Sequence, residues 1–323
     1  MFRRVLIGLL GLALFLVLVI CSLLFTQGAS RYLANLLDAG TDLEIEYGGG
    51  SLFNSLHLAR LTVSVDGVHV ELNNIHSELD GACLWRGSVC LEYLRVAELN
   101  VTVGDAEEEV EDEESSPFWP LPFQVGSDRV SIDSLLVQWD SGNLAGQSIS
   151  ASAEVYGSQI HIFSARGSSV WLDIPPDEAP TEYPLHLPEV DLPVDLLVDE
   201  LTLEDSGWLI SGLQNQYGKL QFSGQWFGRE LQVHSLAVMN DEWGGAELVG
   251  RMEFLHPYPL SASAQYEAAA PSVWQGLHGS SGKLGIEGDL QALVLDVDHC
   301  GDVNLQGTAA GNVPAVPFRT TGH

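Results

Sequence analysis

The chain has 323 residues and a formal net charge of −31, with only 13 Lys and Arg against 44 Asp and Glu. Binding nucleic-acid phosphates requires clustered cations, so this composition argues against a nucleic-acid binder and equally against attraction to anionic lipid headgroups through the soluble part of the chain. The length predicts two modules or one elongated module.

The N-terminus carries an apolar segment long enough to cross a bilayer. Val5 to Phe25 comprises 21 residues without a charge, which as a helix measures about 31 Å against roughly 30 Å of hydrocarbon. Arg3 and Arg4 precede it, so the positive-inside rule keeps the N-terminus cytoplasmic and exports the rest. Residues 1–27 are therefore predicted as a single-pass anchor, with a cleavable signal peptide as the alternative. The anchor positions are Val5, Leu10, Leu14, Val19 and Phe25.

A short amphipathic helix and a first β module are predicted over residues 28–104. Gly28 to Gly40 places Leu33, Leu36 and Leu37 on one helical face. From Leu43 onward apolar and polar residues alternate, as half-buried strands require.

An eight-residue pattern recurs within these strands. Segments starting at residues 56, 94, 130, 196 and 231 are apolar at their positions 1, 3, 6 and 8. The odd step from position 3 to position 6 would change sheet face, so a bulge or bend is predicted there. The repetition is typical of a sheet that grows by adding units. The first three copies are predicted to line one apolar face with Leu56, Leu58, Leu61, Val63, Leu94, Val96, Leu99, Val101, Val130, Ile132, Leu135 and Val137.

Cys83 and Cys90 lie in the segment ACLWRGSVC. Outside the cytoplasm thiols are oxidised, which favours a disulfide between them. Two free thiols and a metal site are the alternatives, although a zinc site would need two further ligands.

Two segments interrupt the strands. Asp105 to Glu114 is acidic at eight of ten positions, and residues 105–126 are predicted as a solvated loop. Strands are expected over 127–173, followed by a proline-rich connector over 174–193. A second β module is expected over 194–323, truncated at its end because a repeating sheet would expose an edge strand there.

No catalytic, metal or cofactor motif is found. The ten histidines lack paired ligand spacing, and the segment at His278 to Lys283 fits neither a phosphate loop nor a nucleophile elbow. We therefore expect a protein that is not an enzyme and needs no cofactor.

In combination, the basic-flanked anchor, the C-L-W-x-x-S-V-C motif, the acidic run and the segment LPEVDLPVDLLVDELTL (Leu187 to Leu203) resemble the N-terminal region of the TamB family. These are inner-membrane subunits of the translocation and assembly module of Gram-negative bacteria, within the AsmA-like group of bridge-like lipid-transfer proteins. Family members are several times longer, so a fragment is expected.

The resemblance implies a mostly β fold, an elongated β-taco with an open apolar groove behind a transmembrane helix. It also implies an inner-membrane location with the bulk in the periplasm. The implied partners are phospholipids and, through a further C-terminal region, the outer-membrane barrel subunit TamA. On the cysteine motif it implies a structural disulfide between Cys83 and Cys90.

Three functions follow from these observations. The first is phospholipid conduction between the inner and outer membranes. The second is assembly of outer-membrane β-barrel clients and autotransporters by β-augmentation. The third is a structural sandwich without a ligand, because alternation also describes a packed double sheet. The family resemblance favours the conduit.

Overall fold

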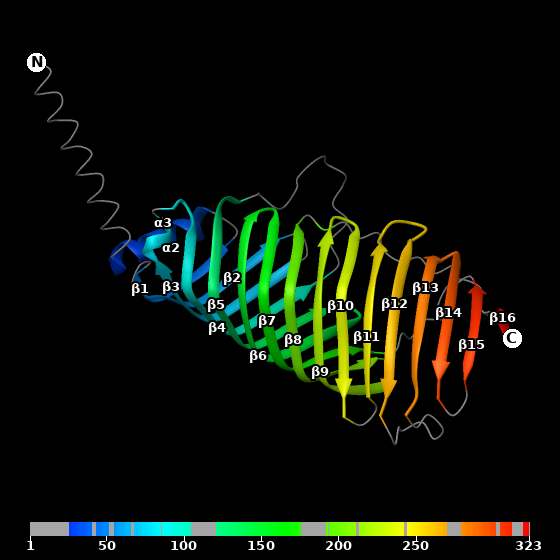
Figure 1. The fold of residues 1–323 in the computed structure, drawn as a ribbon. Helices are drawn as coiled ribbons and strands as arrows, with labels where there is room; N and C mark the ends of the chain where they lie inside the picture. The colour runs from blue at the N-terminus through cyan, green and yellow to red at the C-terminus, as the bar shows by residue number, and fades with distance from the viewer. Residues whose placement is uncertain are drawn as a thin grey trace, which may run out of the picture. The chain divides into compact units, whose positions relative to one another are not determined.

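Figure 1 shows the fold of the protein, a computed structural model. The anchor segment Val5–Phe25, its flanking Arg3 and Arg4, and the acidic run Asp105–Glu114 lie outside the residues that the structure describes. Among the described residues, no helix combines the length and apolarity needed to cross a membrane. The described residues are 26–40, 43–51, 55–65, 68–84, 86–104, 121–175, 192, 194–210, 213–241, 244–269, 279–301, 304–311 and 319–322.

The chain divides into two compact units, residues 1–111 with 123–140, and residues 112–122 with 141–323. In the first unit the strands pair in chain order, antiparallel from β1 to β4 and parallel between β4 and β5. Its elements are α2 (Gln27–Gly40), β1 (Leu43–Ser51), β2 (Ser55–Val65), β3 (Val68–Asp80), α3 (Gly81–Leu84), β4 (Val89–Val103) and β5 (Leu121–Trp139).

The second unit is a sheet whose strands also follow chain order, from the green β6 to the red β16 in Figure 1. All its neighbours are antiparallel except β7 and β8. The strands are β6 (Gly142–Gly157), β7 (Gln159–Ile174), β8 (Asp195–Ile210), β9 (Leu213–Phe227), β10 (Glu230–Asn240), β11 (Gly244–Glu253), β12 (Leu260–Ala268), β13 (Ser281–Asp289), β14 (Ala292–Cys300), β15 (Leu305–Gly311) and β16 (Arg319–Gly322).

The mostly β fold with few short helices is thus confirmed for the described residues. Helix α2 confirms the helix predicted over 28–40 and begins one residue earlier.

Each of the two parallel strand pairs is joined by a long connection. A tight turn reverses direction, so a parallel neighbour needs a connection that returns over the length of a strand. Residues 104–120, with the acidic run, join β4 to β5, and residues 175–194, with the prolines, join β7 to β8. Strand β5 begins at Leu121, so the loop predicted over 105–126 extended too far. The ladder with β4 begins at Val125, beside Val89, within the segment predicted as loop, and the local composition does not reveal this pairing.

The predicted bulge between positions 3 and 6 of the repeat is confirmed in the second unit. The ladder shifts register between Val198 and Leu201 of β8, and between Val233 and Leu236 of β10. Asp199 and Glu200, the two residues between the apolar positions of β8, are both exposed.

In the first unit an equivalent irregularity crosses four strands. The ladder omits Ala59, Asn74, Ala97 and Asp133, which lie in line across β2 to β5. We call this line the crease. Asn74 has a φ of 55°, a left-handed conformation that asparagine tolerates better than most residues. On β5 the consecutive residues Asp133 and Ser134 are both exposed, as expected where a strand gains one residue without turning over its apolar side.

The buried core is small. Only nine apolar residues among those described are buried, including Ile75, Val96 and Val198. A packed sandwich buries the inward side chains of both sheets at high density. The burial pattern is therefore that of a sheet whose apolar side is only partly covered.

Candidate functional site: an apolar face on β2 to β5

Four rows of side chains cross β2, β3, β4 and β5 on one side of the sheet. Because paired residues of neighbouring strands point to the same side, the ladder register defines each row. The rows are Leu56–Ser77–Leu94–Val130, Leu58–Ile75–Val96–Ile132, Leu61–Leu72–Leu99–Leu135 and Val63–Val70–Val101–Val137. We call this surface the apolar face.

All twelve positions predicted from the repeat fall in these rows, three to a row. Two rows lie on each side of the crease, which keeps both halves of each strand on the same face. The register thus brings together residues up to 81 positions apart, from Leu56 to Val137.

The four positions on β3 were missed by the sequence analysis. Val70, Leu72, Ile75 and Ser77 have the same spacing as the repeat, because the steps 2, 3 and 2 are unchanged when the chain is read backwards. An antiparallel strand presents the pattern in that reversed order. A search that allowed reversal, and a serine in one position, would have found it.

The apolar face is shielded unevenly. Val96 is 2% exposed and Ile75 is 6% exposed, so the row beside the crease is the best packed. The remaining members of the four rows are half-buried. A contiguous apolar surface over four strands that keeps partial access to solvent is typical of a ligand or partner site.

The opposite side of the same strands is polar. Arg95 donates to Asp133 with 2.9 Å between the nitrogen and the oxygen. The rings of His57 and His76 stack with their centroids 4.3 Å apart, and His57 is bonded to the Asn74 amide oxygen. The Arg95–Asp133 pair is exposed and contributes little to stability. The side chains exposed to water on this side include Arg60, Arg95, Glu98 and Asp133.

The second unit by itself also has a row of mostly apolar and small residues. This row reads Ile162, Val198, Gly224, Val233, Gly250, Ala262, Ile286, Leu295 and Ala309 from β7 to β15. Its side chains become smaller toward β11 and β12.

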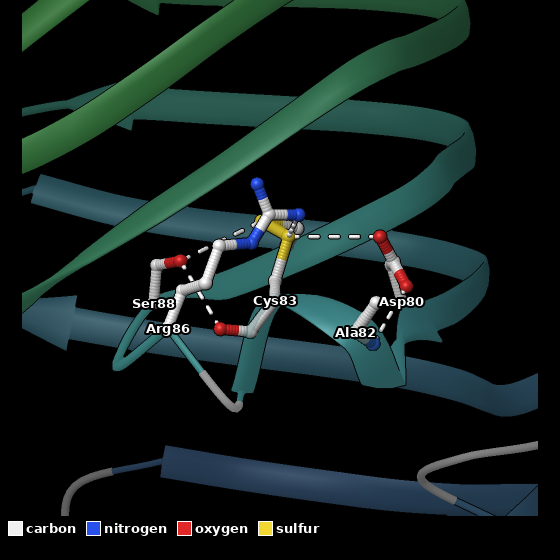
Figure 2. Close-up of a disulfide and its surroundings, with 6 residues drawn as sticks. Asp80, Ala82, Cys83, Arg86 and Ser88 are labelled. Atoms are coloured by element: carbon white, nitrogen blue, oxygen red, sulfur yellow. Dashed lines mark hydrogen bonds between the residues drawn. A yellow bond between two sulfur atoms is a disulfide. The ribbon is translucent and has the colours of Figure 1, made fainter.

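Figure 2 shows the corner that closes the β3–β4 connection, where Cys83 and Cys90 form a disulfide. Asp80 accepts a 2.8 Å hydrogen bond from the Ala82 amide, which caps the short helix α3. The Arg86 amide and the Ser88 hydroxyl both donate to the Cys83 carbonyl, at 2.8 Å and 3.3 Å. Since Asp80 pairs with Cys90 on the ladder, the disulfide joins the corner to the first pair of the hairpin.

The described residues offer little chemistry beyond this. No group of three or more His, Cys, Asp or Glu side chains in the described part of the chain is gathered closely enough to hold a metal ion. The thiol of Cys300 is exposed on β14 and is not in a disulfide.

A family model described as TamB, N-terminal domain, matches residues 16–323. No solved structure matches the chain.

Proposed function

The chain belongs to the TamB N-terminal domain family, and from this membership we propose that it is an inner-membrane-anchored periplasmic protein that conducts phospholipids between the inner and outer membranes. The apolar face is its conduit, so the work is transfer rather than catalysis. Its partners are phospholipids and the outer-membrane subunit TamA, which would engage a part of the assembly other than this face.

The observation that carries the proposal is the unbroken apolar face on both sides of the crease. The register joins 15 apolar side chains and one serine over four strands, and most of them are half-buried. Each CH₂ group of an acyl chain that leaves water for such a surface gains at most about 0.8 kcal/mol. An acyl chain laid across several rows would therefore be held by many small contributions, without a specific pocket.

The polarity of the two sides supports transfer rather than storage. The polar side, with Arg95, Asp133 and the histidine pair, keeps the back of the sheet in water. Headgroups would stay solvated at the edge of the apolar face. Because the face extends by repetition of the same pattern, neighbouring positions bind acyl chains with similar strength. A lipid can then move along it without a deep free-energy minimum.

Assembly of outer-membrane barrels by β-augmentation is the alternative, and β1 is the strand available in the first unit. Among the described residues it is hydrogen-bonded to β2 alone. However, its register breaks around Tyr47, and Glu44 and Glu46 point outward and are exposed. Bulges and charges are the devices that protect a sheet edge from pairing. This strand is therefore a poor template, and the conduit is favoured.

Photocrosslinking in cells tests the proposal. A photoreactive residue is placed at Leu58, Leu99 or Val137 on the apolar face. The matched controls Arg60, Glu98 and Gln138 are each one or two residues away, on the polar side. All three controls are exposed, so a non-specific reaction with surrounding lipid would label them at least as strongly.

Phospholipid adducts on the apolar set alone would support the conduit. Adducts with outer-membrane proteins at those positions, without lipid, would overturn it in favour of the assembly function. Equal labelling of both sets would also reject the conduit, because the face would then have no preference for acyl chains.

A further inference from the structure

Helix α2 has two different sides. Ser30 is 3% exposed and Ala34 is 7% exposed, one helical turn apart. On the opposite side, also one turn apart, Tyr32 is 64% exposed and Leu36 is 54% exposed. A tyrosine and a leucine placed together on the outer side of a surface helix are an unpartnered apolar pair.

The inner side of α2 is attached to the first strand. Helix α2 contacts β1. The Tyr47 hydroxyl of that strand donates to the Gly50 carbonyl at 2.5 Å and lies 3.3 Å from the Gln27 carbonyl of the helix. Tyr47 pairs with Leu58, so it lies at the β1 end of a row of the apolar face. The helix is thereby held beside the start of that face.

Charge and chain position identify what covers the outer side. Arg31 is exposed and is the only charged residue among the described side chains of α2, and the first turn holds no acidic residue. With Asp38 also in its sequence, α2 carries one charge of each sign, in contrast to the −31 of the whole chain. The predicted membrane span ends at Phe25, two positions before the helix begins. A helix joined so closely to a span begins at the bilayer surface.

We propose that α2 lies in the interface of the membrane, with Tyr32 and Leu36 at the boundary between headgroups and acyl chains. Tyrosine is favoured at that depth because its ring is apolar and its hydroxyl remains hydrated. Arg31 extends to the lipid phosphates, as basic residues of interfacial helices do. The ligand is the surface of the lipid bilayer.

The placement has a consequence for transfer. Since α2 packs against β1, an interfacial α2 sets β1, the strand next to the apolar face, at the outer leaflet of the inner membrane. Acyl chains can then reach Leu58 and Leu61 from the bilayer without crossing water. This inference rests on the proposed function for its membrane anchor.

The test uses the full chain reconstituted in vesicles of phosphatidylethanolamine and phosphatidylglycerol. Tyr32→Cys and Leu36→Cys are labelled with a fluorophore in a background carrying Cys21→Ser and Cys300→Ser, without reductant so that the disulfide persists. Ser263→Cys, at an exposed position on β12, is the matched control. Quenching by nitroxide-labelled lipid is compared with quenching by aqueous iodide at each position.

The expected result is several-fold stronger lipid quenching and several-fold weaker iodide quenching at positions 32 and 36 than at position 263. Iodide quenching at 32 and 36 equal to that at 263 would overturn the inference.

Photocrosslinking at Leu58 and Leu99 in the same vesicles separates the two proposals. Lipid adducts there without interfacial quenching leave the conduit standing and reject the role of α2. Interfacial quenching without adducts supports α2 and rejects the conduit.

Discussion

Removing the disulfide is expected to loosen the β3–β4 hairpin and little else. The perturbation is the double variant Cys83→Ala with Cys90→Ala. The two cysteines are seven positions apart, and closing a loop of that size constrains the unfolded chain by about 2.5 kcal/mol on the entropic model. The backbone bonds to the Cys83 carbonyl remain in the variant, so the native corner should persist.

The effect should be local because each strand is stabilised by its neighbours, and a sheet of this kind opens in parts. A loss of about 2.5 kcal/mol corresponds to a roughly 70-fold increase in the opening equilibrium. Amide hydrogen exchange at Leu79, Asp80, Cys90 and Leu91, which pair next to the disulfide, should accelerate by that factor. Peptides from β13 and β14 should not change.

The control variant is Cys300→Ser, which alters a cysteine outside the disulfide and should leave exchange in the hairpin unchanged. An acceleration below about threefold in the double variant would refute the reasoning, since the corner would then be held by its hydrogen bonds alone. Equal acceleration in β13 and β14 would refute the local character of the unfolding.

Three further predictions follow from single positions. Val96→Ala should lower the free energy of unfolding by about 2 kcal/mol in urea denaturation because Val96 is 2% exposed, whereas Val103→Ala, at 39% exposure, should cost less than about 1 kcal/mol. Gly244→Ala should reduce the protection of amides in β11 and β12 from hydrogen exchange, because Gly244 has a φ of +103° and an added Cβ would lie 2.0 Å from a backbone oxygen. The control Gly157→Ala, at a φ of +61° with open space around the added Cβ, should lower the free energy of unfolding by only about 1 kcal/mol. Burial raises the pKa of Tyr217 above its ordinary value, so with rising pH the tyrosine of the unfolded chain loses its proton first. The free energy of unfolding, measured by urea titration, should therefore be constant below pH ~10 and decrease above it. Tyr217→Phe should weaken this pH dependence.

The parts of this protein that the sequence predicted well are local ones. Alternation of apolar and polar residues marks which side of a strand is buried, because successive side chains point to opposite sides. The three-residue step from Val198 to Leu201 predicted a bulge because an odd step would otherwise turn the apolar side over, and the ladder shifts register there. Helix α2 was visible because its apolar residues follow the helical period over a short stretch.

The sequence did not reveal which strands are neighbours or in which direction they run. Strand β3 carries the repeat in reverse, and its place between β2 and β4 depends on pairing over distance. The parallel pairings of β4 with β5 and of β7 with β8 follow from connections whose composition says nothing about where the chain returns.

By itself, the sequence determined that each strand has one apolar side, because this property depends only on the alternation of apolar and polar residues along the strand. Only the tertiary structure decided that the apolar sides of β2 to β5 align in continuous rows and are not covered as a sandwich would cover them. Register and coverage depend on contacts between residues far apart in the chain, and the same alternation is compatible with either arrangement. Val96 is 2% exposed, whereas Leu99 on the same side of β4 is half-buried, although both occupy apolar positions of the same repeat.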